Sequence, residues 1–108
     1  MIENTQGIDE IVMRPRACCK CVIGNDWYIN AFEITFIPSK VYPDYMQVNE
    51  WIMGHIDGQA LNIEDAVERV YNYLMETYSP RSLYVVDEVK GAKTHFDVIV
   101  TKRGRGDI

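Results

Sequence analysis

Three cysteines lie close together, at positions 18, 19 and 21. An odd number packed so tightly is not typical of a disulfide framework, so we expect free thiols in a reducing, cytoplasmic setting. A thiol becomes a nucleophile when nearby positive charge favours its thiolate. The nearest cations in the sequence are Arg14, Arg16 and Lys20, so this run could supply a nucleophilic cysteine.

Two other interpretations of the cysteine run stay open. Cys18 and Cys21 have the two-residue gap of a metal-ligand pair, but no second pair follows. Only His55 and His95 could complete such a shell, and we therefore expect no metal site. A free cysteine is also often a small buried hydrophobe, so the residues alone do not decide between packing and catalysis.

Two polar side chains outside the cysteine run are further candidates. Glu64 could accept hydrogen bonds from two neighbouring N–H groups of a planar base. Alternatively, it could simply favour the positive end of a helix dipole. His95 is interpreted either as a surface or interface histidine or as a residue that lines a pocket.

Alternating patterns predict the strands that would position these residues. The clearest strand covers 27–37, with Phe32, Ile34 and Phe36 on one face, and Pro38 ends it. Shorter strands are predicted at 8–14, 83–89 and 95–101, with Gly91 in the turn between the last two.

A helical period predicts two helices between the strands. The first covers 44–55, with Asp44 as its N-cap. The second begins at Asn62, where Asp65 could complete a capping box, and it ends before Pro80. The resulting order, β-β-α-α-β-β, favours an α+β fold with the helices on one face of an antiparallel sheet.

Length and composition limit the size of the domain and the class of partner. Residues 1–108 suffice for a single domain, 47% of them are hydrophobic, and no apolar run is long enough to span a membrane. The net charge of −5 argues against a basic nucleic-acid face. The basic residues at 102–105 are interpreted as a solvated tail or a phosphate contact. Seven tyrosines and two tryptophans suit subunit interfaces.

The stretch from Cys21 to Trp27, followed by a strand that ends in Phe36-Ile37-Pro38-Ser39-Lys40, resembles the 7-cyano-7-deazaguanine reductase family. In that family a Cys-Pro-x-x-Gly-type turn leads into a strand that ends Tyr-Ile-Pro-x-Lys. The order of elements continues to match to about Thr101. The short chain is most similar to the QueF-like branch, whose members form an amidine in archaeosine synthesis and are not reductases.

The resemblance implies a mechanism at these positions. Cys21 stands where the family's nucleophile stands, and it would add to the nitrile carbon of 7-cyano-7-deazaguanine to give a covalent thioimide. Glu64 would hold the guanine-like edge of the base. Tyr28 stands where the family has an aspartate, seven residues after the cysteine, so either Tyr28 or the nearby Asp26 would donate the proton to the nitrile nitrogen.

Further departures from the family pattern concern the cofactor. The reductase motif that contacts NADPH falls at 42–47, where only Asp44 keeps an acid and the lysines are missing. Without those cations a phosphate-bearing nicotinamide loses its electrostatic anchor. The resemblance therefore implies conversion of the nitrile to an amidine with ammonia, without a redox cofactor, and leaves Asp44 as a substrate-binding candidate. The alternatives are NADPH-dependent reduction to the aminomethyl base and a non-catalytic protein that binds a purine or pterin.

The resemblance also implies a fold and partners. The fold would be the tunnelling fold, an antiparallel four-stranded sheet with two helices on one face. Such subunits are similar to others that assemble into rings, so we expect a homo-oligomer, a pentamer or a decamer, with Cys21 and Glu64 acting across an interface. The ligand would be a small-molecule 7-deazaguanine base, free or presented in a nucleic acid, and no membrane would be involved.

Overall fold

The long strand β4 (Trp27–Ile37) forms the centre of the sheet. We describe it from a computed structural model that covers residues 1–91 and 94–106. One side of β4 pairs with β6 (Ser82–Val89), which in turn pairs with β7 (Val98–Arg105). Both pairings are antiparallel, and the predicted strand 27–37 is confirmed at both of its ends.

Two short strands share the other side of β4. β2 (Ile11–Met13) pairs with the second half of β4, and β3 (Arg16–Lys20) pairs with the first half. Pro15 lies between them and has no amide to donate, so the ladder is interrupted there. The sheet is therefore four strands wide, as expected. However, the sequence predicted one strand at 8–14, whereas the structure has two strands here, and Cys18 and Cys19 lie within the second.

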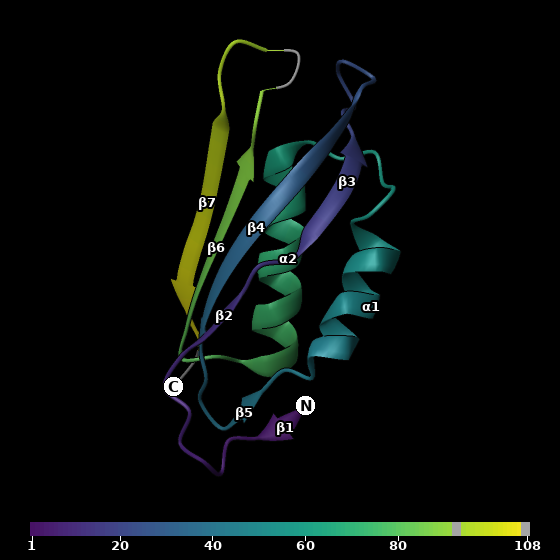
Figure 1. Cartoon of the computed structure of the whole chain (residues 1–108). Helices are drawn as coiled ribbons and strands as arrows, with labels where there is room; N and C mark the ends of the chain where they lie inside the picture. The colour runs from purple at the N-terminus through teal and green to yellow at the C-terminus, as the bar shows by residue number, and fades with distance from the viewer. Residues whose placement is uncertain (92–93, 107–108) are drawn as a thin grey trace.

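Both helices lie on one face of this sheet (Figure 1). The first is α1 (Tyr45–His55), and Asp44 caps it by accepting a hydrogen bond from the Met46 amide at 2.9 Å. The second is α2 (Ile63–Tyr78). The two helices and the cap at Asp44 are as predicted.

The two ends of α2 compare differently with the prediction. Asn62 occupies the N-cap position, but its side chain makes no capping hydrogen bond, so the predicted capping box is wrong. The backbone of Asn62 still accepts the Ala66 amide at 3.1 Å. At the other end Ser79 adopts a left-handed conformation with φ 43° and Pro80 follows, as the Ser-Pro signal predicted.

The last strand begins and ends later than predicted. β7 begins at Val98, so His95 lies in the connection before it. The reason is local hydrogen bonding, since Asp97 Oδ1 accepts the Gly91 amide at 3.0 Å and the Thr94 hydroxyl donates to the Phe96 carbonyl at 2.9 Å. The basic residues at 102–105 belong to β7, so their interpretation as a solvated tail is wrong. At the opposite end of the molecule β1 (Ile2–Glu3) pairs with β5 (Val41–Tyr42).

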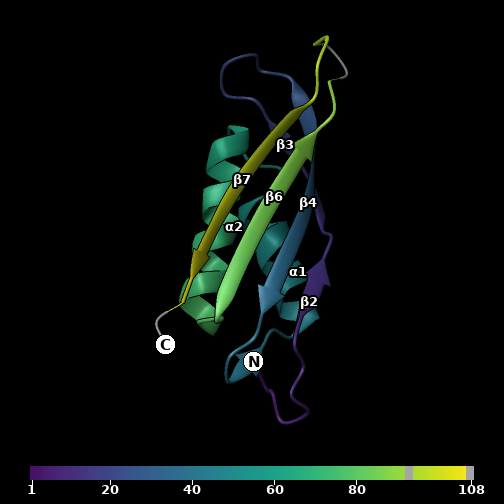
Figure 2. The same cartoon turned by 90° about the vertical axis from the view of Figure 1, so that its left-hand side faces the viewer.

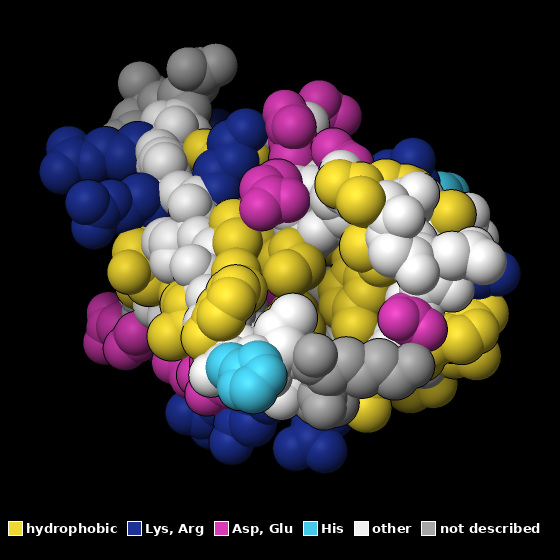
Figure 3. Space-filling view, turned by 90° about the horizontal axis from the view of Figure 1, so that it is seen from above, with side chains coloured by type: hydrophobic (Ala, Val, Ile, Leu, Met, Phe, Trp, Pro, Cys, Tyr) yellow, Lys and Arg dark blue, Asp and Glu magenta, His cyan; other side chains and the backbone are white. Residues whose placement is uncertain are grey.

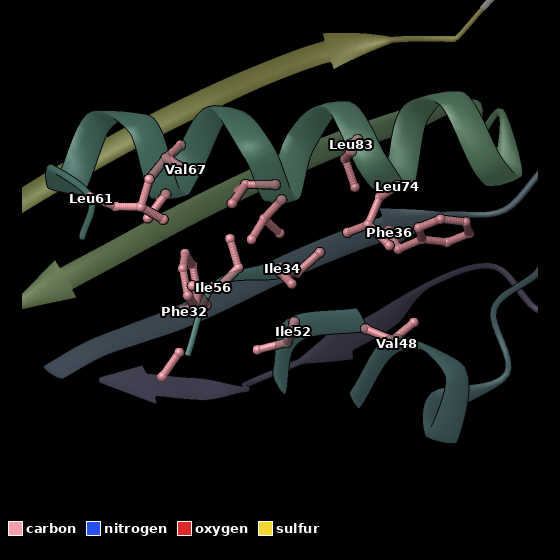
Figure 4. Packing of buried hydrophobic residues seen from close by; sticks show 14 of the residues in the cluster. Phe32, Ile34, Phe36, Val48, Ile52, Ile56, Leu61, Val67, Leu74 and Leu83 are labelled. Carbon is pink, nitrogen blue, oxygen red and sulfur yellow. The ribbon is translucent and has the colours of Figure 1, made fainter. Parts of the chain in front are cut away.

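The core lies between the sheet and the two helices (Figure 4). Alternate residues of β4 and β6 point toward the helices, and each helix packs an apolar stripe of side chains against them. The buried residues of the sheet include Phe32, Ile34, Phe36, Leu83 and Val85, and those of the helices include Val48, Ile52, Val67, Val70 and Leu74.

The other face of the sheet is not covered by any described element. Figure 2 shows β7, β6 and β4 side by side with the helices behind them. Large apolar side chains on this face are open to solvent: Trp27 is 59% exposed, and Ile29 and Ile99 are each 61% exposed. An apolar face of this kind is unusual for an isolated domain.

Gly104 on β7 lies where no side chain fits, which gives a prediction about stability. A Cβ on Gly104 would collide with the Tyr71 hydroxyl and lie 3.2 Å from the ring carbon that bears it. Gly104→Ala is therefore expected to lower the free energy of unfolding by about 1–3 kcal/mol, the usual cost of overpacking. Adding Tyr71→Phe should recover part of that loss. Gly54→Ala meets nothing within 4 Å and serves as the control, and equal melting temperatures for the two single variants would contradict the prediction.

Candidate functional site

Cys21 begins a tight turn between β3 and β4. The Cys21 amide donates to the Asp26 carbonyl at 2.8 Å, and the Asn25 amide donates to the Cys21 carbonyl at 2.9 Å. Asn25 has a φ of 60°, which asparagine tolerates better than most residues. The Gly24 amide donates to Cys21 Sγ at 3.4 Å. The turn therefore holds a half-buried thiol whose sulfur faces a backbone N–H, an arrangement that can stabilise negative charge developing there.

The loop between α1 and α2 runs along β3 and is hydrogen-bonded to Lys20, the residue before the Cys21 turn. The Lys20 amide donates to the Gln59 carbonyl at 2.9 Å, and the Leu61 amide donates to the Lys20 carbonyl at 3.1 Å. Cys21 directly follows Lys20, and Glu64 follows Leu61 by three residues. The structure therefore brings Cys21 and the Glu64 end of α2 to the same end of the subunit (Figure 1). Glu64 itself is exposed in the first turn of α2.

Asp57 fixes the beginning of the same loop, a role that the sequence analysis missed. Asp57 Oδ1 accepts the Cys18 amide at 2.8 Å, and the Gly58 amide donates to the Cys18 carbonyl at 2.7 Å. Gly58 has a φ of 78°, which glycine adopts readily, and the Asp57-Gly58 pair forms a turn here. Asp57 acts as an extra acceptor for β3.

Tyr28 contacts this loop through its hydroxyl, which donates to the Leu61 carbonyl at 2.5 Å. Burial raises the pKa of Tyr28 above its usual range, and nearby negative charge on Cys19, Asp87 and Cys21 adds to the effect. Tyr28 is therefore a neutral side chain whose proton is already shared with a carbonyl. Asp26, the other acid candidate, lies on the exposed side of the Cys21 turn.

Two of the three cations that could favour a thiolate contact other groups. Arg14 lies 3.4 Å from Glu33, near the middle of β4. The Lys20 ammonium lies 5.9 Å from the centre of the Trp27 ring, on the uncovered face of the sheet. Arg16 is exposed on β3. The Gly24 amide, which lies in the stretch 21–27 that carries the resemblance, is the group observed on the Cys21 sulfur.

Asp44 and His95 occupy opposite ends of the subunit. Asp44 caps the start of α1, far from the Cys21 turn (Figure 1). His95 lies in the connection between β6 and β7, at the same end as Cys21. Within one subunit the structure thus brings His95, Glu64 and Cys21 to one end and places Asp44 at the other. In the described part of the chain no three His, Cys, Asp or Glu side chains converge on a common metal position.

Seen from the end that carries the Cys21 turn, hydrophobic side chains run across the middle of the surface, with acidic side chains beside them (Figure 3). A groove on the surface lies elsewhere, between β2 and α1. It is lined mainly by apolar residues such as Ile11, Met13, Val48 and Ile52. Among the described residues, its lining includes no cysteine, serine or histidine.

A buried polar cluster lies behind Cys21, and the sequence analysis missed it. Cys19 donates through Sγ to the Ile56 carbonyl at 3.2 Å, and burial raises the pKa of its thiol. Asn30 donates to the Ala17 carbonyl at 3.1 Å. Asp87 is completely buried, and burial raises its pKa to about 7. Cys19 therefore has the packing role that was left open for the cysteine run.

Comparison with known proteins identifies the fold. No protein-family profile matches the chain, and no curated protein matches it significantly. Among solved structures, the QueF-like archaeosine synthase in its apo form superposes with a TM-score of 0.81 and 12% identity, covering 94% of this chain and 98% of the other. A structure described provisionally as a dihydroneopterin aldolase from Vibrio cholerae superposes with a TM-score of 0.72 and 16% identity. The match covers 91% of this chain and 98% of the other.

These likenesses extend over nearly the whole chain, and they establish that it has the tunnelling fold, as expected. The identities are low, so the likenesses extend to the fold and not to the chemistry. Neither helix is both long and apolar enough to cross a membrane within the described residues.

Proposed function

We propose that this chain is an enzyme of 7-deazaguanine metabolism, similar to the QueF-like branch, that converts the nitrile of 7-cyano-7-deazaguanine to an amidine through Cys21. The observation that carries the proposal is the hydrogen-bonded link between Lys20 and Leu61, which places the Cys21 thiol and the Glu64 carboxylate at one end of the subunit. The structural likeness to an archaeosine synthase supports it. The base would be free or carried in a nucleic acid.

Cys21 performs the covalent chemistry in this proposal. Its S–H adds across the C≡N bond, so a C–S bond forms and the thiol proton ends on the nitrile nitrogen as a thioimide N–H. Ammonia then attacks the same carbon, the C–S bond breaks, and the amidine leaves with the thiol restored. No electrons are gained or lost, so neither step needs a redox cofactor.

Other side chains bind the base and move the proton. Glu64 accepts hydrogen bonds from the ring N–H and the exocyclic amine of the base. The Gly24 amide holds the sulfur, and Asp26 on the same turn relays the proton, because it protonates the nitrile nitrogen and takes up the thiol proton in exchange. Tyr28 orients the loop before Glu64 through the Leu61 carbonyl. His95, at the same end, lines the pocket, and Asp44 would reach a base only from a neighbouring subunit.

The open sheet argues for a ring assembly. In the described structure β2 and β7 are edge strands, which leave unpaired backbone groups that a second copy can satisfy. The apolar face that carries Trp27, Ile29 and Ile99 is also uncovered. We propose a homo-oligomer, a pentamer or a decamer, in which these edges meet and the Cys21 site is completed by the next subunit.

Intact-protein mass spectrometry tests the proposal. Incubation with 7-cyano-7-deazaguanine is expected to add the mass of one base to each chain, and later addition of ammonium is expected to remove the adduct and release the amidine. Aminomethyl product formed only with NADPH would support reduction instead. An unmodified chain that is folded and oligomeric would contradict the nitrile chemistry.

A non-catalytic binding protein for a purine or pterin is the second candidate. The observation that favours it is Tyr28, which stands in place of an acid and has its proton committed to Leu61. The likeness to the Vibrio cholerae structure supports the same candidate. A melting temperature that rises when guanine or a pterin is added, with no covalent adduct, would favour this function.

A further inference from the structure

Three buried acceptor oxygens lie behind the candidate site without a hydrogen-bond partner among the described residues. They are both carboxylate oxygens of Asp87 and Oδ1 of Asn30. Asp87 and Asn30 are each 0% exposed. Buried polar atoms are nearly always hydrogen-bonded in folded proteins, and a lone buried carboxylate is especially costly. A donor is therefore needed at this place.

The strand register brings the two side chains together. Asp87 on β6 lies opposite Phe32 on β4, and Asn30 is two residues away on the same inward face of β4. Such diagonal neighbours are about 7–8 Å apart at their Cα atoms, and both side chains lie near enough to the Cys19 thiol to affect its pKa. The simplest donor is a proton on Asp87 itself, because a neutral carboxyl can donate to Asn30 Oδ1 and satisfy both residues at once.

We propose that Asp87 is a neutral carboxylic acid that donates a hydrogen bond to Asn30 and thereby positions the polar cluster that backs Cys21. This role deepens the nitrile chemistry proposed for Cys21 and rests on it. Asp87 is too deeply buried to touch a substrate, so it acts as a positioning residue.

The first hydrogen bond on the path from Asp87 to the Cys21 turn, from Asp87 to Asn30, is the proposed one. The contacts that follow it are observed. Asn30 Nδ2 donates to the Ala17 carbonyl of β3 at 3.1 Å. Cys19, two residues further along β3, donates to Ile56 and fixes the loop that follows α1. β3 then leads directly into Cys21. An Asn30 side chain that lost its partner would be free to turn, and β3 would lose a fixed point just before the nucleophile.

The surroundings of Asp87 explain why the neutral acid is favoured. Burial is the main cause of its raised pKa, which is about 7, and the Ala31 backbone amide lies near enough to offset it slightly. Its titratable neighbours on β4 and β3 are Tyr28 and Cys19, whose ionisation Asp87 opposes.

The elements on the other sides supply no compensating charge. Lys102 of β7 lies 3.6 Å from Glu68 and 4.9 Å from the Tyr71 ring centre. The first turns of α2 present Ala66, Val67 and Val70 to the core. The arrangement resembles other acids that an apolar site keeps neutral so that they can donate.

A pair of variants separates this role from a purely structural one. Asp87→Asn keeps a donor for Asn30 and cannot ionise, whereas Asp87→Leu keeps the size and removes the donor. The rate of adduct formation on Cys21 with 7-cyano-7-deazaguanine is measured from pH 6 to pH 8.5. It is divided by the rate of Cys21 alkylation by iodoacetamide, which reports the thiolate but does not depend on the position of the sulfur relative to a bound base.

The wild-type ratio is expected to fall about tenfold over this range as Asp87 ionises, because an ionised Asp87 no longer donates to Asn30. Asp87→Asn should keep the ratio within about threefold of the wild-type value at pH 6 across the whole range, and Asp87→Leu should lower it about tenfold throughout. Equal pH profiles for wild type and Asp87→Asn would overturn the role of Asp87.

Infrared spectroscopy tests the charge state without the substrate. The wild-type protein is expected to show a protonated carboxylic acid band at pH 6 that fades as the pH rises toward 8.5 and that Asp87→Asn lacks. If this band is absent, Asp87 is not protonated and the proposal is refuted, even if the protein forms adducts. Conversely, its presence in a protein that forms no adduct supports the neutral Asp87 and refutes only the nitrile chemistry.

Discussion

Cys21→Ser is expected to abolish covalent attachment of 7-cyano-7-deazaguanine, with a loss of at least about a thousandfold in rate. A serine hydroxyl is a poor nucleophile without an adjacent base, and the group that contacts the Cys21 sulfur in the described structure is the Gly24 amide, which is not a base. The matched control is Cys18→Ser. The register pairs Cys18 with Ile29 on the uncovered face of the sheet, so this substitution should leave the rate within about twofold.

The environments of the three cysteines explain why Cys21, and not Cys18 or Cys19, is expected to react. Cys19 is buried and its thiol donates to Ile56, so it has no access to a ligand. Cys21 is half-buried, its sulfur accepts the Gly24 amide, and it lies at the Glu64 end of α2. Intact mass and peptide mapping of both variants, with melting curves to verify folding, check the result. An adduct that survives Cys21→Ser and disappears in Cys18→Ser would reverse the assignment.

The long elements were predictable because each carries its pattern over many residues. β4 repeats its alternation over eleven residues and α2 keeps its stripe over sixteen. By contrast, β3 has only five residues and its inward positions are Ala17 and Cys19, which do not look like a strand face. Its strand conformation depends on pairing with β4 and on Asp57, and both contacts are distant in the sequence.

The candidate site divides in the same way. The positions of Cys21 and Glu64 came from an ordered resemblance, and the structure accounts for their proximity through Lys20 and Leu61. Asp87 left a signal, because it is the one charged residue on the inward face of β6. Its partner could not be found from that signal, since only the register between β4 and β6 places Asn30 diagonally from it.

Asp87→Asn is expected to stabilise the protein at pH 8 by about 2–4 kcal/mol and to lose most of that advantage at acidic pH. The pKa of Asp87 is raised to about 7 in the folded state from a model value of 3.8. The folded state therefore holds this proton more tightly than the unfolded state does. Stability from this group is intact below about pH 4, falls as pH rises toward 7, and stays at its lowest value above that.

The pH dependence, rather than the size of the effect at one pH, identifies the cause. Between pH 5 and pH 8 the wild-type protein should lose about 2–3 kcal/mol relative to Asp87→Asn, because each unit of pKa shift corresponds to about 1.4 kcal/mol. Urea unfolding at a fixed protein concentration, at both pH values, measures this difference, and the many groups common to both proteins cancel. Asp65→Asn, on the exposed first turn of α2, controls for the loss of one carboxylate. A constant offset between wild type and Asp87→Asn would mean that Asp87 is ionised throughout, and that another donor, such as a buried water or an ammonium ion, satisfies it and Asn30.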